Sequence, residues 1–421
     1  MAKGSIIFKS ESGKGPNNAA KFAVVQDCTS VDRIIEMLEK DWALPQPSVL
    51  LSVTGSAQDL RLESSLEQIV KHGLADAARS TNAWVFTGGT DAGVMGLTGL
   101  ALRDLGSDLG SGGREGDGAK SARTPCIGIP PWRKCTHRER LCPNPAPPVT
   151  STDGTWEPVD DRSDTSLEVI YVKRKTTRAS ATLDPNHTHH ILVDNGKDEF
   201  GGEINFRGTI EQALSQRMGV PMVLVVVQGG PGTFATVRRG IETGQRIILV
   251  KESRGAAQVI SEYIEPLLPE ADHLMYLSRE DLLRRLETRD AEFAPRMAKL
   301  NRKMDEKQVA RCRDDLHAIA QRLDLLTVFS AYSERNFDVA VLRAIVASFK
   351  SKCALTPAPT PLSLYLSLSL YPLSLSLSLS LSHTHTHTLA LSLTLSLSLS
   401  LSLSLSLCLH PHLSAAIALA R

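Results

Sequence analysis

The sequence lacks the features that mark several common protein classes. Its seven cysteines are scattered, odd in number and form no Cys-x-x-Cys pair, so we expect reduced thiols and no metal site. Lys plus Arg is 47 and Asp plus Glu is 46, and a net charge of +1 gives no general attraction to nucleic acid or acidic membranes. Residues 1–12 lack a signal-peptide pattern, and no uninterrupted apolar run reaches about 18 residues. We therefore expect a cytoplasmic protein without a membrane span.

Aromatic residues are scarce, at 5%, because the C-terminal part is almost entirely Leu and Ser. Residues 361–410 read as a translated dinucleotide repeat, so we interpret residues 351–421 as a low-complexity tail that is not a native domain. Two structural alternatives remain for this repeat. As a strand it presents one Leu face and one Ser face and is prone to aggregate, and as a helix it has borderline hydropathy for a membrane.

Short apolar runs alternate with helical stretches between residues 22 and 288. Strands without polar alternation are buried on both faces, and helices between them imply a parallel sheet. The pattern predicts an α/β fold, a Rossmann-like, doubly wound and mostly parallel sheet. The predicted strands are residues 48–53, 83–86, 126–129, 190–193, 222–227 and finally 246–250, and the predicted helices are 31–40, 63–79, 94–104, 207–217 and 256–264.

Other segments have different compositions. Residues 1–21 are polar and glycine-rich and are expected to be disordered, as are the loops 105–124 and 142–165. The basic segment 130–140 is better explained as a solvated loop than as a wall that attracts phosphate. Residues 289–350 are expected to form an α-helical linker that leads into helical repeats, which stop where the tail begins.

Two glycine-rich turns follow predicted strands. They are Gly88-Gly-Thr-Asp-Ala-Gly93 (the first turn) and Gly229-Gly-Pro-Gly-Thr233 (the second turn). Glycine lets backbone approach a ligand, and the helix that follows offers free N–H groups and a positive dipole end. Together the turns predict a site for the phosphate of a nucleotide or phosphosugar. Either turn alone is also explained by tight strand–helix packing.

Several enzyme signatures are missing. Neither turn is the Gly-x-Gly-x-x-Gly dinucleotide fingerprint, and Gly-x-Ser-x-Gly, His-Glu-x-x-His and kinase motifs are absent. The second turn resembles the Pro-Gly-Gly-x-Gly-Thr-x-x-Glu motif of LOG phosphoribohydrolases, with Gln228 at the leading proline and Thr236 at the catalytic glutamate. This resemblance implies a binding derivative of an enzyme fold, with no catalytic residue. A stand-alone nucleotide or phosphosugar hydrolase is the alternative, with Glu203, Glu211 or Glu242 as its acid.

A wider resemblance is to the N-terminal SLOG (LSDAT) domain of TRPM, or melastatin-type, cation channels, nearest the ADP-ribose-gated branch. It rests on Ala83-Trp-Val-Phe-Thr-Gly-Gly-Thr-Asp-Ala-Gly-Val-Met95, on Asn186-His-Thr-His-His-Ile-Leu-Val-Asp-Asn-Gly196 and on Phe200-Gly-Gly-Glu-Ile-Asn-Phe-Arg207. Leu325-Leu-Thr-Val-Phe329 and Asp338-Val-Ala-Val-Leu342 resemble the start of that family's helical repeats. The resemblance implies a calcium- or cation-channel fragment whose pore is missing through truncation.

The resemblance also implies ADP-ribose or a related nucleotide as a regulatory ligand, with no cofactor required. Phe200 matches the family's stacking aromatic, Arg207 its first arginine, and Ser253-Arg254 its Gly-Ser-Gly-Arg with the last two residues exchanged. The predicted ligand-binding residues are Gly88, Gly89, Thr90, Asp91, Gly93, Val94, Met95, Phe200, Arg207, Gly229, Gly230, Pro231, Gly232, Thr233, Ser253 and Arg254.

Plainer explanations exist for several of these residues. Arg207 can pair with Glu211 at i,i+4, Asp91 can cap a helix, and Asp194 can form a turn. His187, His189 and His190 are better explained by packing than by metal binding. The implied partner is the rest of a homotetrameric channel, which would place this region on the cytosolic face of a membrane. A scaffold with a vestigial pocket is the remaining alternative.

Overall fold

The computed structural model describes residues 1–9, 18–57, 60–108, 123–141, 167–172, 179–267, 279–300 and 305–355, with four short segments between 375 and 397. The chain divides into two compact units, Met1–Ile345 and Val346–Arg421, which are described separately. Within the described ranges, no helix is both long and apolar enough to cross a membrane.

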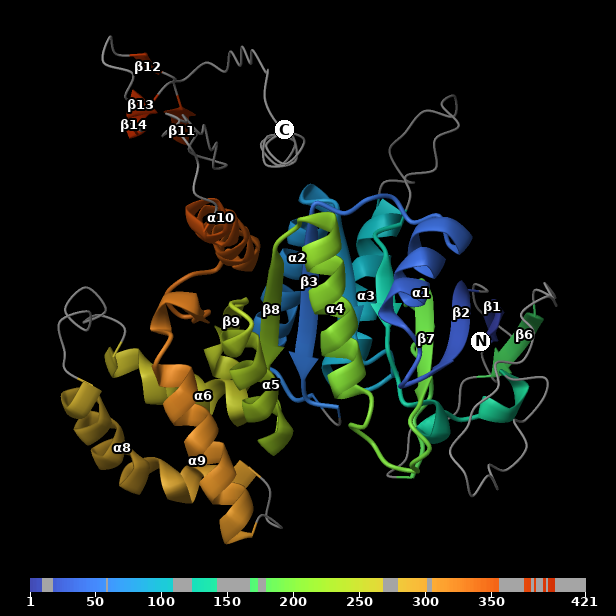
Figure 1. Cartoon of the computed structure of the whole chain (residues 1–421), viewed down its shortest axis with the longest axis horizontal. Helices are drawn as coiled ribbons and strands as arrows, with labels where there is room; N and C mark the ends of the chain where they lie inside the picture. The colour runs from blue at the N-terminus through green and yellow to red at the C-terminus, as the bar shows by residue number, and fades with distance from the viewer. Residues whose placement is uncertain are drawn as a thin grey trace. The chain divides into compact units, whose positions relative to one another are not determined.

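One ten-stranded sheet runs through the first unit in the order β10-β9-β8-β3-β4-β5-β7-β2-β1-β6 (Figure 1). All neighbouring strands are parallel except the β1–β2 pair. The predicted α/β fold with a mostly parallel sheet is confirmed. The strands are β1 Ala2–Lys9, β2 Asn18–Gln26, β3 Val49–Gly55, β4 Ala83–Thr87, β5 Cys126–Gly128, β6 Leu167–Val172, β7 His189–Asp194, β8 Met222–Val227, β9 Arg246–Val250 and β10 Leu326–Phe329.

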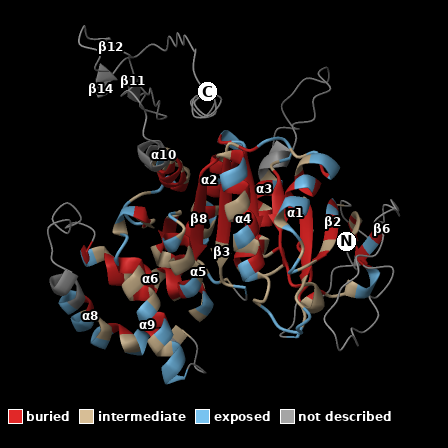
Figure 2. Cartoon of the chain, viewed as in Figure 1, coloured by how far each residue is buried: buried red, intermediate tan, exposed pale blue. Residues whose placement is uncertain are grey.

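The central strands form the core because their side chains are apolar on both faces. Every residue of β4 and β8 is buried, and most residues of β3 and β9 are buried as well (Figure 2). Three successive β-branched valines, Val225 to Val227, suit a strand that is covered on both sides. All six strands expected from apolar runs are present.

Helices cover the sheet. They are α1 Val31–Glu36, α2 Ser64–Ser80, α3 Gly93–Asp108, α4 Ile204–Met218, α5 Pro231–Glu242, α6 Gly255–Ile264, α8 Arg279–Leu300, α9 Glu306–Ala320 and α10 Phe337–Leu355. Helix α1 continues into η1, a π-helical turn over Met37–Asp41, in which the N–H of Trp42 donates to the carbonyl of Met37. Helices α2 and α3 pack on each other, as do α1 and α4, whereas α5 and α6 share a core with α8 and α9.

The direction of chain progress through the sheet reverses between β3 and β8. From β3 the chain moves outward to β4 and β5, and from β8 it moves the other way to β9 and β10. Right-handed crossovers then place α2 and α5 on opposite faces of the sheet. A crevice opens at such a switch point, at the carboxyl ends of the two strands, and this is where open α/β sheets bind ligands.

The structure corrects several predicted boundaries. The expected disorder is wrong for residues 1–9 and 18–21, because β1 and the start of β2 pair antiparallel there and bury Ile6, Phe8 and Ala20, while residues 10–17 lie outside the described residues. Residues 246–250 are not the last strand, since β10 pairs with β9. The sheet therefore extends beyond the predicted limits 22–288 at both ends, and residues 289–350 are not wholly helical.

The predicted loops fall largely on residues that the structure does not describe. Helix α3 runs to Asp108, so the first residues of the expected loop 105–124 are helical. Residues 109–122 and the whole of the expected loop 142–165 lie outside the described residues.

The second unit contains short paired strands. Strand β11, Leu375–Leu379, pairs antiparallel with β14, Leu393–Leu397, and β12, Ser382–His383, pairs with β13, Leu389–Ala390. In the first pair, Leu stands opposite Leu, and Ser stands opposite Ser or Thr. The strand alternative for this repeat is therefore present in part of it. That the tail is not a native domain stays a prediction.

Candidate functional site

The second glycine turn lies at the switch point and faces open space. It follows β8 and leads into α5, whose N-cap is Gly230 and whose first residue is Pro231. A Cβ atom added to Gly230 or Gly232 would meet no described atom within 4 Å. Proline at the start of a helix sacrifices no hydrogen bond, and the positive end of the helix dipole is directed at this space. A helix N-terminus that faces open space in this way can accept an anion.

The loop after β9 fixes the shape of the second turn. The hydroxyl Oγ of Ser253 accepts a hydrogen bond from the Gln228 N–H at 2.6 Å and donates to the carbonyl of Val250 at 2.5 Å. The N–H groups of Ala256 and Ala257, at the start of α6, donate to the carbonyls of Gly229 and Gln228 at 3.0 and 2.8 Å. Ser253 is fully buried, so it holds the second turn from the interior of the protein.

Strained backbone surrounds the second turn. Gln228 and Arg254 are non-glycine residues with φ of 62° and 69°, next to Gly229 at 92° and Gly255 at 63°. A left-handed conformation costs a side-chain-bearing residue about 1–3 kcal/mol and is concentrated at functional sites. Arg254 therefore occupies a conformation that favours glycine, which is what the exchanged Ser-Arg-Gly order entails. Its side chain is exposed at the carboxyl end of the sheet.

The first turn is held by a closed circuit of hydrogen bonds around Gly89. The Gly89 N–H donates to Oγ1 of Thr87 at 2.8 Å, and the Gly89 carbonyl accepts from the N–H of Asp184 at 3.0 Å. Thr87 Oγ1 lies 2.6 Å from Nε2 of His187, whose Nδ1 lies 2.6 Å from Oδ2 of Asp184. We name these residues, Thr87, Gly89, Asp184 and His187, the Gly89 circuit. Its three side chains are fully buried.

Burial and charge act in opposite directions on His187. Burial by itself lowers the pKa of the imidazole, but Cys126 and the Asp184 carboxylate outweigh it and raise the pKa to about 10. Nδ1 of the ring lies 2.6 Å from the Asp184 carboxyl, so the two side chains form a buried pair. The arrangement resembles a nucleophile–base–acid triad, but no solvent or substrate reaches it. The Gly89 circuit consequently positions backbone.

Close packing explains the glycines of the first turn. Gly89 has φ of 72°, and a Cβ added to it would lie 2.7 Å from Cα of Gly128. Besides Gly89, the N–H groups of Asp91, Ala92 and Val94 donate to the carbonyls of Thr182, Thr90 and Ser56. The tight-packing explanation thus fits the first turn, while the second turn fits the anion site. The predicted contacts of Gly88, Thr90, Gly93, Val94 and Met95 with ligand stay predictions.

Arg207, on α4, links this helix to strands β3 and β4 through side-chain hydrogen bonds. Its Nε donates to Oε1 of Glu211 at 2.8 Å, and Nη2 donates to Oγ of Ser52 at 2.8 Å. The same Nη2 donates to the carbonyls of Val53 and Phe86, each at 3.1 Å, near the ends of β3 and β4. The plainer explanation, an i,i+4 pair with Glu211, is therefore present. A ligand contact by Arg207 stays a prediction.

Phe200 lies on the loop between β7 and α4. Its side chain is half exposed, and Nζ of Lys134 lies 5.5 Å from the ring centroid. An exposed ring with a cation on one face leaves the other face for a ligand.

The candidate acids of a hydrolase are engaged in other contacts. Thr236 stands at the position of the LOG glutamate, and its hydroxyl donates to the carbonyl of Gly232 at 3.2 Å. Glu211 is paired with Arg207, and Glu242 with Arg238 at 2.8 Å. Burial raises the pKa of Glu203, whose Oε2 accepts from the N–H of Gly201.

The basic segment 130–140 is largely neutralised by neighbouring acids. Arg133 donates from Nε and Nη2 of its guanidinium to the two carboxylate oxygens of Asp194, at 2.6 and 3.3 Å. Nζ of Lys134 lies 3.2 Å from Oδ1 of Asp198. Asp194 also accepts from the N–H of Gly196, the turn contact expected of it. Within the described residues, no group of three or more His, Cys, Asp or Glu side chains could hold a metal ion.

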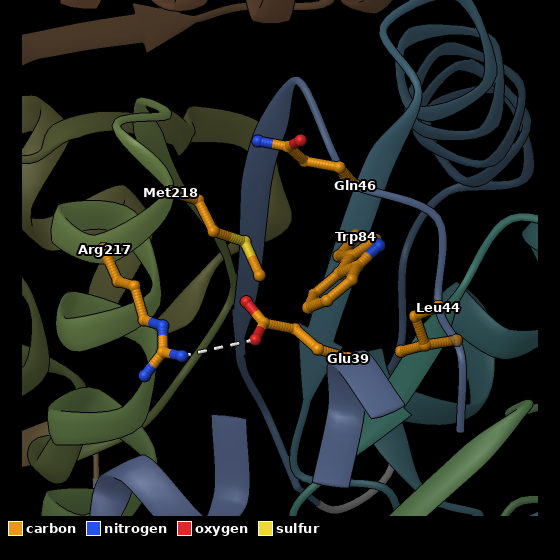
Figure 3. Close-up of a pocket in the computed structure, with 6 residues that line it drawn as sticks. All are labelled: Glu39, Leu44, Gln46, Trp84, Arg217 and Met218. Atoms are coloured by element: carbon orange, nitrogen blue, oxygen red, sulfur yellow. Dashed lines mark hydrogen bonds and ion pairs between the residues drawn. The ribbon is translucent and has the colours of Figure 1, made fainter. Parts of the chain in front are cut away.

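A separate cavity of about 340 Å³ lies at the other end of the strands. Figure 3 shows Trp84 at its centre, with Glu39 and Arg217 joined across it at 3.4 Å. These residues and Leu44, Gln46 and Met218 precede β3 and β8 or begin β4, so the cavity is at the amino edge of the sheet. It is distinct from the glycine turns, which follow the carboxyl ends.

Sequence reasoning found both turns but missed how they are held. Thr87 and Asp184 were not singled out, and His187 was assigned only to packing. The available signal was the density of buried polar residues before β7, because buried polar groups require partners.

Comparison with known proteins places this geometry in a family. Residues 20–300 match the model described as SLOG in TRPM. The chain is 30% identical to Transient receptor potential cation channel subfamily M member 2 of Rattus norvegicus over 83% of this chain and 21% of that protein. It is 31% identical to the member-like 2 protein of Nematostella vectensis over 62% of this chain and 16% of that protein, and 26% identical to member 7 of Homo sapiens over 82% and 17%. The chain thus spans about a fifth of the length of these relatives.

Proposed function

The chain belongs to the family of SLOG domains in TRPM channels, and we propose from that membership that it is a ligand-sensing region of a TRPM-like cation channel. The proposed ligand is ADP-ribose or a related nucleotide, bound in the crevice between β3 and β8. The matched relatives bear the name of cation channels, and an attached pore would make the ligand a regulator of calcium or other cation transport. In that setting the region would lie on the cytosolic side of a membrane within a homotetramer.

The observation that carries the nucleotide proposal is the open second turn. Gly230 and Gly232 leave space at the start of α5, and Ser253 fixes the turn in shape before any ligand arrives. A preformed cradle binds phosphate without a cost of ordering. Arg254 is exposed beside this cradle, and its fork can bind two phosphate oxygens.

The site supports binding without catalysis. Thr236 supplies no carboxylate at the place where LOG enzymes carry one, and Glu211 and Glu242 are held in ion pairs. A ligand that contacts both the second turn and Arg254 would instead stabilise the loop after β9 in its present place. Because β10 pairs with β9 and leads towards α10, this stabilisation would reach the region that joins the rest of a channel.

Isothermal calorimetry of the full chain with ADP-ribose tests this proposal. We expect saturable heat at micromolar to millimolar ligand and no release of free base over hours. Arg254→Ala should weaken binding by about tenfold, because a charged hydrogen bond is worth about 1.5–3 kcal/mol. The absence of heat at millimolar ligand would contradict the proposal, and release of base would favour a hydrolase.

A further inference from the structure

Tyr332 is exposed to an unusual degree for a large aromatic side chain. It is 82% exposed, whereas the other exposed large hydrophobic residues in the described chain, Ile170, Phe200 and Ile204, are about half exposed. It lies in the loop between β10 and α10, which begins at Ser330. The ring of Tyr332 therefore keeps its apolar faces in contact with water, and the reason for this exposure has to lie in its surroundings.

The loop that carries Tyr332 is firmly held. Ser330 Oγ donates to Oε1 of Glu252 at 2.5 Å, and the N–H of Ala331 donates to Oε2 of the same carboxylate at 3.0 Å. The N–H groups of Ser333 and Glu334 both donate to the Ser330 carbonyl, which closes a tight turn around Tyr332. Arg343 of α10 then pairs with Glu334 at 2.9 Å. Tyr332 therefore projects from a fixed turn.

The same contacts place the loop of Tyr332 beside the loop that holds the second glycine turn. Glu252 precedes Ser253, whose hydroxyl holds the N–H of Gln228, and it stands two residues before Arg254. Neighbouring strands are about 4.8 Å apart, so the ends of β10 and β8 are about 10 Å apart in the sheet. That separation suits a ligand with phosphate at one end and an aromatic ring at the other.

We propose that Tyr332 is the outer wall of the nucleotide site and stacks on the base of a ligand whose phosphate occupies the second turn. This inference rests on the proposed function and assigns the ligand class more narrowly, to nucleotides that carry a heterocyclic base. Because the turn that carries Tyr332 is already fixed, only its side chain has to be ordered when the ring stacks. Arg254 lies between the two ends and meets the charged centre of such a ligand.

Phe200 is a second aromatic residue that could stack on the ligand, and it lies elsewhere in the fold. It precedes α4 beside Lys134, whereas Tyr332 follows β10 beside Glu252. Stacking on Phe200 alone would make binding insensitive to Tyr332. The two aromatic residues therefore make separable predictions for the same ligand.

The test uses the full chain with ADP-ribose and with ribose 5-phosphate, which lacks the base. We expect Tyr332→Ala to weaken ADP-ribose binding by about tenfold, since base stacking on an aromatic is worth about that factor, and to leave ribose 5-phosphate binding unchanged. Tyr332→Phe keeps the ring and should bind ADP-ribose within about twofold of the wild type. Glu252→Gln should give an intermediate loss, because it weakens the hold on the loop.

Because Tyr332 is exposed, Tyr332→Ala should unfold at the same temperature as the wild type, so a loss of affinity is not a loss of fold. If Tyr332→Ala binds ADP-ribose with wild-type affinity, the proposal for Tyr332 is overturned while the proposed function stands. An equal loss of affinity for ADP-ribose and ribose 5-phosphate would also overturn it, because Tyr332 would then not act by stacking on the base. A wild-type chain that binds neither ligand would instead overturn the proposed function.

Discussion

The imidazole Nδ1 of His187 lies 2.6 Å from Oδ2 of Asp184, and both side chains are completely buried. The pair closes the Gly89 circuit, in which the Gly89 carbonyl accepts from the N–H of Asp184, and the Gly89 N–H donates to Thr87, which is itself hydrogen-bonded to His187. Its partners come from parts of the chain about a hundred residues apart. The first turn therefore owes its shape to tertiary contacts as much as to its own glycines.

Breaking this pair should destabilise the fold. Asp184→Asn keeps the shape but removes the buried carboxyl that is hydrogen-bonded to His187, and we expect a loss of about 3 kcal/mol in the free energy of unfolding. Urea denaturation followed by circular dichroism measures it. His72→Gln, on an exposed part of α2, is the matched control and should change stability by less than about 0.5 kcal/mol. A similar small change in Asp184→Asn would contradict the Gly89 circuit.

Acid should weaken the fold through His189. Burial, followed by Lys21 and Arg123, lowers the pKa of this imidazole to about 3, and burial lowers that of His190 as well. The unfolded chain has a histidine pKa of about 6.5, so between pH 6.5 and 3 it binds a proton that the folded chain does not. Stability should therefore fall as pH falls through this window, by up to about 1.4 kcal/mol per pH unit for one histidine.

His189→Phe tests this pH dependence because it keeps a ring against Trp42, whose centroid lies 4.6 Å away. Denaturation at pH 7 and at pH 4.5 should show a smaller acid loss in the variant than in the wild type. Identical pH profiles would show that His189 is not the titrating group.

The two glycine turns should respond oppositely to alanine. Gly89→Ala forces a side chain into φ of 72° against Gly128 and should cost about 2–3 kcal/mol. Gly232→Ala meets open space at the start of α5, so stability should hold or rise by up to about 1 kcal/mol, while phosphate binding falls. Thermal unfolding and calorimetry report the two effects. Equal destabilisation by both changes would refute the distinction between a packing turn and a ligand turn.

We expect Arg254 to lower the stability of the fold and to raise the affinity for ligand. Arg254→Gly removes the strain of φ 69° and should stabilise the chain by about 1 kcal/mol, while affinity for ADP-ribose drops because the guanidinium is lost. Arg254→Lys keeps both the strain and the charge and should lie between wild type and Arg254→Gly in affinity, without the gain in stability. The idea fails if Arg254→Gly binds as the wild type does.

Local sequence pattern accounts for the centre of the fold but not for its edges. The apolar run Met222–Val227 identifies β8 because both faces of a central strand are buried. Strand β1 escapes such a search because its apolar run, Ile6 to Phe8, is only three residues long and is flanked by Ser5 and Lys9. Strand β10 is short, and it belongs to the sheet because it pairs with β9. Its own residues do not predict that pairing.

The site was likewise only half predictable. Glycine and proline in Gly229-Gly-Pro-Gly-Thr233 mark a turn before a helix, so the cradle could be located. The same residue types in the first turn serve packing, and only the position of Gly128 beside Gly89 distinguishes the two. Nothing local in the sequence shows that Ser253 is bonded to Gln228, or that Glu252 is bonded to Ser330 and Ala331, because these contacts join separate loops.

Hydrogen–deuterium exchange of the full chain with and without ADP-ribose tests the central claim most directly, because it locates the ligand. We predict slower exchange in residues 228–234 and 252–257, with no change in residues 37–46 and 214–220 around the cavity at the amino edge of the sheet. Protection at that cavity, or at neither place with saturating ligand, would contradict a nucleotide site at the second glycine turn.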